Sequence, residues 1–410
     1  MGNTLNKAER TSIGWLLVSK TFERLAFYLL FSILMNYMMS KVQPGVKNTG
    51  LQFGFFMVAL AITSFFSGIL GDRYNRKKIV IIGFILLTVM YLVIPFLPGV
   101  SLLLTIVFVL LGIGIALTIP NMIVLLGNIY DEKGNESRRL SGFILFIFAA
   151  QLGGFLAPLI ASFLKTHWGY TSIFLLAATC GLVALLFFIQ FTRSSRNPDT
   201  ASAQQTHPSF VSWRKQDNVI LLSVLITALV TWFSLQLRGT TLVTALKDLT
   251  ERGSELSSML VPMETYLLPL IMLLFAWWVS RNKTMHWGRI FCIMLVGLAF
   301  AITGYLTIAG FTSLKEIIQD KIVIYLFYSF LLIAESLLAP TFLYAVYRSS
   351  PPKHKGLFQG IYHLVIAVST SLFFLGRSLY EIMGSGMFAL IAGLLLIGAV
   401  VLLWVRKSVV

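Results

Sequence analysis

Three charged side chains interrupt an apolar stretch near the start of the chain, in the segment KTFERLAFY, residues 20–28. Lys20, Glu23 and Arg24 follow the i, i+3, i+4 spacing of a helix and therefore share one stripe of its surface. Tyr28 continues that stripe one turn further on. Lipid would reject such a stripe, so we expect it to face a polar cavity and to bind a proton or a solute there. A cluster of charges that only orders helix packing is the alternative interpretation.

A further acid, Glu335, lies in the segment AESLLAP, residues 334–340, within another apolar stretch. A carboxyl group in a low-dielectric cavity can bind a proton from the acidic side of a membrane and release it when an ammonium or an arginine arrives. Such an exchange would couple the movement of a solute to a proton gradient. A permanently protonated Glu335 that bonds to a backbone carbonyl is the alternative. Arg238, in a third apolar stretch, could hold a carboxylate, or it could extend its charged end toward the membrane surface.

The elements that carry these residues are long and apolar. Hydrophobic residues make up 57% of the 410 residues and charged residues only 12%, which is too few to cover a water-soluble globule. Apolar stretches recur that are long enough to cross about 30 Å of hydrocarbon as helices. We therefore expect an all-α integral membrane protein with 12 transmembrane helices. They are predicted at residues 12–39, 51–71, 78–97, 101–129, 139–164, 169–192, 217–246, 256–280, 286–309, 321–347, 354–382 and 386–405.

The basic residues are distributed unevenly among the loops. The net charge of +16 could indicate nucleic-acid binding, but successive loops alternate between many and few basic residues. The loop at residues 73–78 carries four, whereas the loop at residues 165–168 carries only Lys165. This alternation follows the positive-inside rule and places both termini in the cytoplasm. We expect a multi-pass protein of a cell membrane, specifically the bacterial cytoplasmic membrane, surrounded by membrane lipid and without a nucleic-acid partner.

A polar segment divides the predicted helices into two sets of six. Residues 193–216 are rich in Ser, Thr, Asn and Pro and show no apolar periodicity. The predicted domains are an N-terminal six-helix bundle at residues 1–192, a cytoplasmic linker at residues 193–216 and a C-terminal six-helix bundle at residues 217–410. A faint repeat supports this division, because GDRYNRKK after the second helix has a counterpart, SRNKTMHWGR, after the eighth. Pseudo-symmetric halves are typical of transporters.

The loop after the second predicted helix begins a motif, GILGDRYNRKK, at residues 68–78. It resembles the loop signature G-x-L-x-D-R-x-G-R-[RK] of the major facilitator superfamily, with Asn75 in place of the second Gly. Asp72 could accept hydrogen bonds from nearby arginines or from the N-terminus of a facing helix, forming a latch that breaks when the bundles rock. Charges that only set the membrane topology are the alternative. The residues implied in gating are Gly68, Asp72, Arg73 and Arg76.

Four further segments resemble the proton-dependent oligopeptide transporters of that superfamily. KTFERLAFY is similar to their first-helix motif E-x-x-E-R-F-x-Y-Y, and AESLLAP is similar to the stretch G-E-L-x-x-x-P of their tenth helix. Residues 119–160 are similar to their helix 4–5 region, and TWFSLQLRGTTL, from Thr231, is a looser match to their seventh helix. The chain is therefore identified as a divergent member of this family (POT/PTR). The resemblance implies proton-coupled peptide transport by alternating access, and it gives Glu23 and Arg24 a part in proton binding and substrate-dependent rearrangement.

Several positions depart from the family pattern at the groups that hold a peptide. Lys20 replaces the first acid of the first-helix motif, so that it can neutralise Glu23. Phe31 and Ile119 stand where the family has an Arg and a Lys for the carboxyl end of a peptide. Glu335 is retained at the place of the Glu that meets the amino group of a peptide. The remaining candidates for substrate or proton binding are Tyr28, Asn121, Gln151, Trp232, Gln236, Arg238 and Glu264.

The predicted function is a proton-coupled secondary transporter for a small peptide or a peptide-like, amine-bearing solute. The alternative is a proton-antiporting exporter of a small metabolite, such as a siderophore-like compound, which the altered peptide clamp favours. An enzyme is not expected, because the sequence shows no nucleophile motif and no metal-ligand spacing. We expect no catalytic residues, no metal, a monomer, and no cofactor, with the proton as the coupling ion.

Overall fold

The computed structural model describes residues 7–37, 46–97, 101–131, 136–195, 215–238, 242, 253–281, 285–312 and 321–409. Among these residues all regular structure is helical, with twelve α-helices and two short 3-10 helices, η2 (Ile94–Phe96) and η3 (Pro352–His354). The all-α fold class predicted from the sequence is therefore confirmed. The α-helices are α1 (Lys7–Tyr37), α2 (Val46–Arg73), α3 (Arg76–Val93), α4 (Ser101–Asp131), α5 (Glu136–Ser194), α7 (Lys215–Leu237), α9 (Gly253–Arg281), α10 (Trp287–Thr312), α11 (Lys321–Ser349), α12 (Lys355–Ser371), α13 (Phe373–Met383) and α14 (Gly386–Val409).

The described helices cross a membrane several times. By length and apolar composition eight of them qualify as spans, or nine if the bent pair α12 and α13 forms one span. The predicted span at residues 354–382 corresponds to that pair, in which the two helices are bent by 43°. Large apolar side chains, such as Phe66 and Leu222, remain exposed along the spans. A helix satisfies its own backbone hydrogen bonds, so lipid can cover such apolar surfaces directly.

Two predicted spans lie within α5, which consists of two helical segments joined at a break. The stretches predicted at residues 139–164 and 169–192 are its two halves, and they meet at Gly169, which has φ 75° and ψ −174°. Only glycine adopts this region of backbone space readily, because a Cβ atom would clash with the neighbouring peptide groups. Gly169 therefore breaks the helical path and allows the chain to turn back.

The chain forms two compact units. The first contains Met1–Ser212 together with Pro351–Ala367, and the second contains Trp213–Ser350 together with Val368–Val410. The boundary between the units thus falls inside α12, so that the start of this helix belongs to the first unit. Residues 196–214 of the predicted linker lie outside the described residues. The division at residues 192 and 217 stays a prediction.

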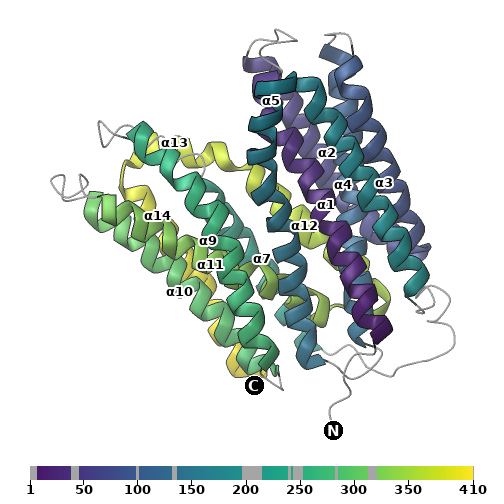
Figure 1. The fold of residues 1–410 in the computed structure, drawn as a ribbon. Coiled ribbons are helices and arrows are strands. Elements are labelled where there is room, and N and C mark those ends of the chain that lie inside the picture. The colour runs from purple at the N-terminus through teal and green to yellow at the C-terminus, as the bar shows by residue number, and fades with distance from the viewer. Residues whose placement is uncertain are drawn as a thin grey trace. The chain divides into compact units, whose positions relative to one another are not determined.

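In the first unit, α1 packs along α5, and α4 packs against α2 and α3 (Figure 1). The core is formed by apolar and aromatic side chains from all five helices, among them Leu29, Phe56, Tyr91, Leu111 and Phe174. In water, burial of such large side chains stabilises a fold by roughly 1.5–3 kcal/mol each. Membrane helices associate instead through close packing and polar contacts, because lipid is as apolar as the side chains themselves. The first unit therefore fixes the position of α1, which carries the charged stripe.

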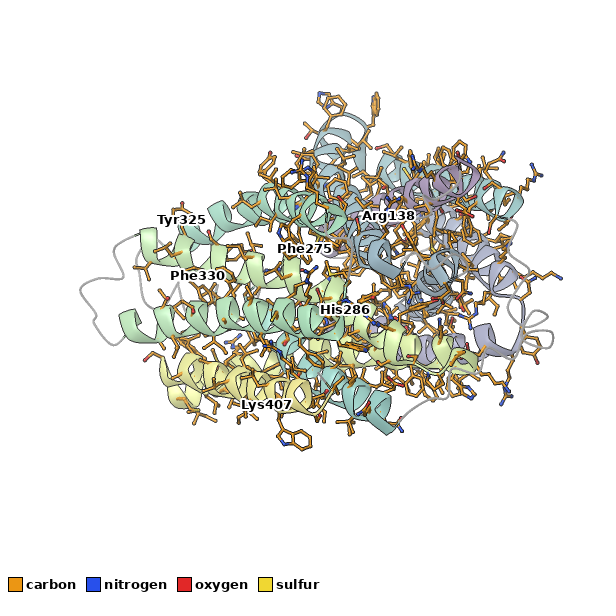
Figure 2. The ribbon with its side chains drawn as sticks, turned by 90° about the horizontal axis from the view of Figure 1, so that it is seen from below. Arg138, Phe275, His286, Tyr325, Phe330 and Lys407 are labelled. Atoms are coloured by element: carbon orange, nitrogen blue, oxygen red, sulfur yellow. The ribbon has the colours of Figure 1, made fainter. Side chains whose placement is uncertain are left out.

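In the second unit, α10 packs between α11 and α14, while α7 and α9 both contact α11. Phe330 on α11 lies 6.0 Å, centroid to centroid, from Phe300 on α10. Phe330 and the buried Phe275 of α9 are labelled in Figure 2 among the side chains of this unit. This packing holds α11 by its neighbours on two sides and so fixes the position of Glu335.

Candidate functional site

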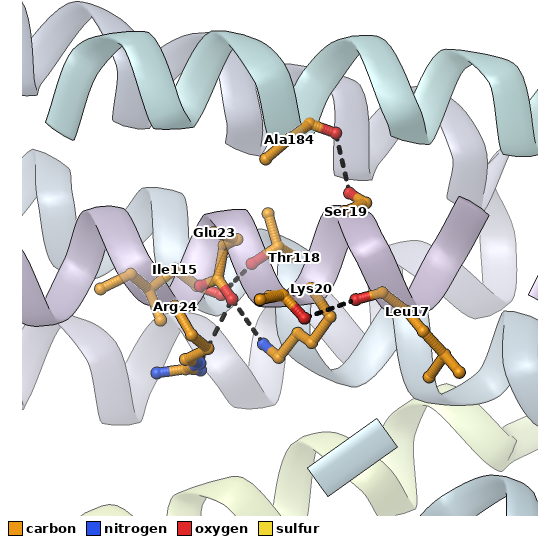
Figure 3. A network of polar contacts seen from close by, with 9 residues as sticks. Leu17, Ser19, Lys20, Glu23, Arg24, Ile115, Thr118 and Ala184 are labelled. Atoms are coloured by element: carbon orange, nitrogen blue, oxygen red, sulfur yellow. Dashed lines mark hydrogen bonds and ion pairs between the residues drawn. The ribbon is translucent and has the colours of Figure 1, made fainter. Parts of the chain in front are cut away.

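The charged stripe on α1 forms one connected cluster (Figure 3). Lys20 Nζ lies 2.7 Å from Glu23 Oε2, and Arg24 Nε lies 3.2 Å from the same oxygen. The side chains of Lys20 and Glu23 are 2% exposed, whereas that of Arg24 is 14% exposed. One acid between two bases gives the cluster a formal charge of +1. Arg24 is the most exposed member of the cluster.

Two glycines allow α5 to approach the backbone of α1 beside this cluster. A Cβ atom at Gly153 would lie 2.5 Å from the Thr21 carbonyl oxygen, and one at Gly154 would lie 3.0 Å from Cε2 of Tyr28. A side chain at Gly153 would push the two helices apart, because it would meet the backbone of α1, and one at Gly154 would displace the Tyr28 ring. Gln151, two residues earlier, is partly buried on α5. The structure thus brings Tyr28 and the charged cluster to the same helix contact.

Asn121 occupies a different place from the charged cluster. It follows Pro120 inside α4 and is fully buried. Its Nδ2 donates to Ser67 Oγ on α2 at 2.9 Å and to the Leu117 carbonyl oxygen at 3.0 Å. The bond to Ser67 ties α4 to α2 close to the gating motif. Contact of Asn121 with a substrate stays a prediction.

The second unit contains its own buried ion pair. Arg238 Nη2 lies 2.7 Å from Glu335 Oε2, and the two side chains are 8% and 9% exposed. The Arg238 guanidinium also lies over the ring of Tyr328, 5.5 Å from its centroid. Arg238 follows directly after the end of α7, so the pair joins α7 to α11. Sequence reasoning selected both residues but did not pair them.

A buried hydroxyl supports the same region of α7. The Tyr305 hydroxyl on α10 donates to the Ser234 carbonyl oxygen at 2.5 Å, and both residues are at most 1% exposed. Trp232 and Gln236 flank Ser234 on α7 and are partly buried. They are within the helix that carries the ion pair, and their contact with a substrate stays a prediction. Glu264 belongs to α9, but its side chain lies outside the described part of the structure.

The gating motif makes contacts that lie wholly within the first unit. The Asp72 carboxylate accepts hydrogen bonds from the backbone N–H groups of Gly356 at 2.9 Å and Leu357 at 2.7 Å. These N–H groups belong to the first turn of α12, where the helix dipole favours a negative charge. Arg76 also pairs with Asp72, whereas Arg73 is exposed. Asn75, in place of the family glycine, caps α3 by accepting a bond from the Lys78 N–H at 2.9 Å.

Gly68 has a steric reason to be glycine. A Cβ atom at this position would lie 2.7 Å from the carbonyl carbon of Gly356 on α12. On the facing helix, a Cβ atom at Gly360 would lie 2.5 Å from the Ser64 carbonyl oxygen. Small residues four positions apart on both helices thus allow the backbones of α2 and α12 to touch. This contact places the start of α12 within reach of Asp72.

A second charged group on the same side of the first unit was missed from the sequence. Asp131, at the end of α4, accepts a bond from Lys355 Nζ at 2.5 Å and also pairs with Arg139. From the sequence, Arg139 and Lys355 are only loop charges. The available signal is Asp131 itself, because the C-terminus of a helix disfavours an acid that has no cationic partner.

Positions that depart from the peptide-binding pattern are apolar in their surroundings as well as in type. Phe31 lies 4.2 Å from the ring centroid of Phe27 and 5.4 Å from that of Phe56. Ile119 also packs against the hydrophobic core of the first unit. One base lies on this aromatic cluster, because the Arg24 guanidinium is over the ring of Phe27, 5.3 Å from its centroid.

Comparison with known proteins defines the class. The sequence profile of the Major Facilitator Superfamily matches residues 16–374 of the chain. The protein therefore belongs to the Major Facilitator Superfamily. It is a multi-pass secondary transporter and not an enzyme, as predicted.

Individual relatives are distant. The di-/tripeptide transporter of Lactococcus lactis subsp. cremoris is 26% identical over 243 residues, which cover 56% of this chain and 48% of that protein. The efflux pump terJ of Aspergillus terreus is 29% identical over 171 residues, covering 38% of this chain and 32% of that protein. The chain thus spans about half the length, or less, of the curated relatives it matches. The solved structure of the human organic anion transporter MFSD10 (TETRAN) superposes on this chain with a TM-score of 0.73 and 17% sequence identity. The match covers 96% of this chain and 99% of that chain, so the two proteins share the fold.

Proposed function

We propose that the protein is a proton-coupled transporter that works by alternating access and moves a small peptide or a peptide-like, amine-bearing solute. The observation that carries this proposal is the buried ion pair between Arg238 and Glu335, at 2.7 Å in the second unit. A buried pair gains little over apolar packing in stability, but breaking it by removing one charge has a large effect. Such a pair is therefore suited to a switch that one proton can operate.

The exchange at Glu335 requires one proton and one cationic group. A proton from the acidic side binds a carboxylate oxygen of Glu335, which becomes neutral and releases the Arg238 guanidinium. The freed guanidinium can then hold a carboxylate of the solute through paired N–H groups. When a solute ammonium or Arg238 returns to Glu335, the proton leaves to the other side. Each cycle moves one proton, and 100 mV of driving force supplies about 2.3 kcal/mol per charge, or roughly fiftyfold accumulation.

The gate of this cycle is proposed at the contact of Asp72 with the first turn of α12. Two charge-assisted hydrogen bonds hold this turn at 2.9 and 2.7 Å. The remainder of α12 beyond Ala367 belongs to the second unit. A change in the position of α12 would have to break these bonds, and Arg76 could then keep Asp72 paired. The Lys355 and Asp131 contact adds a second bond that would open with it.

Peptides are supported as substrates by the distant relationship to a di-/tripeptide transporter and by an acid at position 335. The acid would meet the amino group of a peptide. For the carboxyl end, Arg238 is the proposed base, because it lies in the same unit as Glu335 and because Phe31 and Ile119 lie in apolar packing. We propose that the protein functions as a monomer in a cell membrane, with the proton as its coupling ion.

The test is uptake of labelled di- and tripeptides into proteoliposomes under an imposed inward proton gradient. Wild type should accumulate a subset of the panel, and Glu335→Gln should lose the dependence on the gradient. The matched control is Glu381→Gln on α13, because Glu381 also pairs with an arginine, Arg377, at 2.9 Å, but its side chain is 61% exposed. Unchanged proton-driven uptake in a folded Glu335→Gln protein would refute the coupling role of Glu335.

Export by proton antiport is the second candidate function. Two observations favour it: the apolar packing of Phe31 and Ile119, and the similarity to an efflux pump. Vesicles prepared in both orientations would separate the two candidates. Substrate-dependent proton flux opposite to the substrate indicates antiport, and flux in the same direction indicates symport. Small amine-bearing metabolites should be included in the panel for this purpose.

A further inference from the structure

Several buried polar atoms of the first unit lack a hydrogen-bond partner among the described residues, and two of them belong to titratable groups on neighbouring sides of α5. These two are Oε1 of Glu23 on α1 and the hydroxyl of Tyr91 on α3. Glu23 is 2% exposed and Tyr91 is 1% exposed, so bulk water does not reach either group. A buried carboxylate oxygen and a buried hydroxyl are almost always hydrogen-bonded in proteins, because losing solvation without a partner is costly. Each atom therefore requires a partner.

The packing of α1 against the second half of α5 places Glu23 at a definite depth. Ser12 Oγ donates to Ser194 Oγ at 2.9 Å, and Ser19 Oγ donates to the Ala184 carbonyl oxygen at 2.8 Å. Tyr37 stacks edge-on against Phe174, with ring centroids 4.8 Å apart. The two helices thus run antiparallel. Glu23 lies one turn beyond Ser19, which brings it level with the residues about one turn before Ala184.

The packing of α3 against the same half of α5 places Tyr91 at a similar depth. The rings of Phe84 and Phe188 lie 5.6 Å apart, and a Cβ atom at Gly181 would lie 2.8 Å from Thr88 Oγ1. Tyr91 follows Thr88 by three residues, about one helical turn. Glu23 on α1 and Tyr91 on α3 therefore both lie near the level of Cys180 on α5. The electrostatic interaction of Tyr91 with Glu23 and Cys180 agrees with this placement.

We propose that the Tyr91 hydroxyl donates a hydrogen bond to Oε1 of Glu23 through one buried water molecule, and that Tyr91 is thereby a positioning residue for the Glu23 carboxylate. A water molecule needs two or more polar partners in a buried site, and these two atoms supply them. Oε2 of Glu23 is already occupied by Lys20 and Arg24. With this bridge, both oxygens of the Glu23 carboxylate have a hydrogen-bond or ion-pair partner.

The consequence concerns when Glu23 takes up a proton, and this consequence rests on the proposed proton coupling. A donor to the charged form of a carboxylate favours that form. Besides Glu23 and Tyr91, the charged or titratable groups of this region are Lys20 and Arg24 on α1, Cys180 on α5 and His363 on α12. Cys180 interacts with Tyr91, and His363 interacts with the charges of Lys20 and Arg24. Replacing Tyr91 by Phe would remove one donor to the carboxylate without changing the charge of the cluster.

The experiment is an infrared titration of purified, substrate-free protein. The carbonyl band of protonated Glu23 is assigned by its loss in Glu23→Gln, or by its displacement in Glu23→Asp if the first variant does not fold. In Tyr91→Phe the midpoint of this band should move to higher pH by about one unit, the effect of one hydrogen bond to a charged group. Tyr37→Phe is the matched control: the Tyr37 hydroxyl, in the same unit, donates to the Ile94 carbonyl oxygen at 3.5 Å, and its removal should leave the midpoint unchanged.

A second measurement needs no variant at position 91. In wild-type protein with ring-labelled tyrosine, the C–O stretching band of a buried tyrosine should change over the same pH range as the Glu23 band. An unchanged midpoint in folded Tyr91→Phe, or a tyrosine band that does not respond, would overturn the proposal. Because no substrate and no gradient are used, these outcomes are independent of the uptake assay with Glu335→Gln. Failure of peptide uptake would therefore leave the Tyr91 bridge standing.

Discussion

At the scale of single residues, Lys20 is the most consequential departure from the peptide-transporter pattern. Its ammonium group lies 2.7 Å from Glu23 Oε2, and both side chains are 2% exposed. Replacing Lys20 by Met should therefore destabilise the folded protein by about 3 kcal/mol, because it leaves a buried carboxylate with a weaker set of partners. Thermal unfolding in detergent measures the loss.

The control for Lys20 is an ion pair that the solvent or headgroups can screen. Arg377→Met on α13 removes the partner of Glu381. The Arg377 side chain is 68% exposed, and exposed ion pairs contribute little to the free energy of unfolding. We expect a large drop in unfolding temperature for Lys20→Met and almost none for Arg377→Met. Equal losses in the two variants would show that burial does not determine the contribution of Lys20.

At the scale of helices, the contact of α2 with the start of α12 depends on glycine. Gly68→Ala places a Cβ atom 2.7 Å from the Gly356 carbonyl carbon, a distance that real Cβ atoms do not occupy. The helices must separate, and Asp72 would then lose its bonds to the α12 backbone. We expect faster hydrogen exchange at Gly356 and Leu357 and a lower transport rate. Gly54→Ala, on the same helix with no atom within 4 Å of the added Cβ, should change neither quantity.

Some features of the helices could be predicted from the sequence and others could not. Apolar length and composition are local properties, so the all-α fold and its membrane-spanning helices could be predicted from them. The two spans predicted at residues 139–164 and 169–192 are likewise separate helical segments of α5, because Gly169 breaks the helical path between them. The pairing of Arg238 with Glu335 joins α7 to α11, and helical periodicity within one segment carries no information on the register between two helices. The bonds of Asn121 to α2 were hidden for the same reason.

At the scale of the whole molecule, the distribution of charge predicts the orientation in the membrane. The first turn of α3 begins at the basic loop of the gating motif, whereas the loop at residues 165–168 carries a single lysine. We propose that the first of these loops faces the cytoplasm, together with both termini, and that the second faces the outside. The bacterial cytoplasmic membrane is the proposed location.

Site-directed labelling tests this orientation in intact cells. The native thiols, buried Cys180 and exposed Cys292, are first replaced by Ala. Single cysteines are then introduced by Lys78→Cys and Thr166→Cys, both at exposed positions. A membrane-impermeant maleimide should label the Thr166→Cys protein in intact cells and the Lys78→Cys protein only after permeabilisation. The reverse pattern would place the gating motif outside. The direction of proton flow that we propose through Glu335 would then be inverted, because the proposed latch at Asp72 would close the opposite side of the membrane.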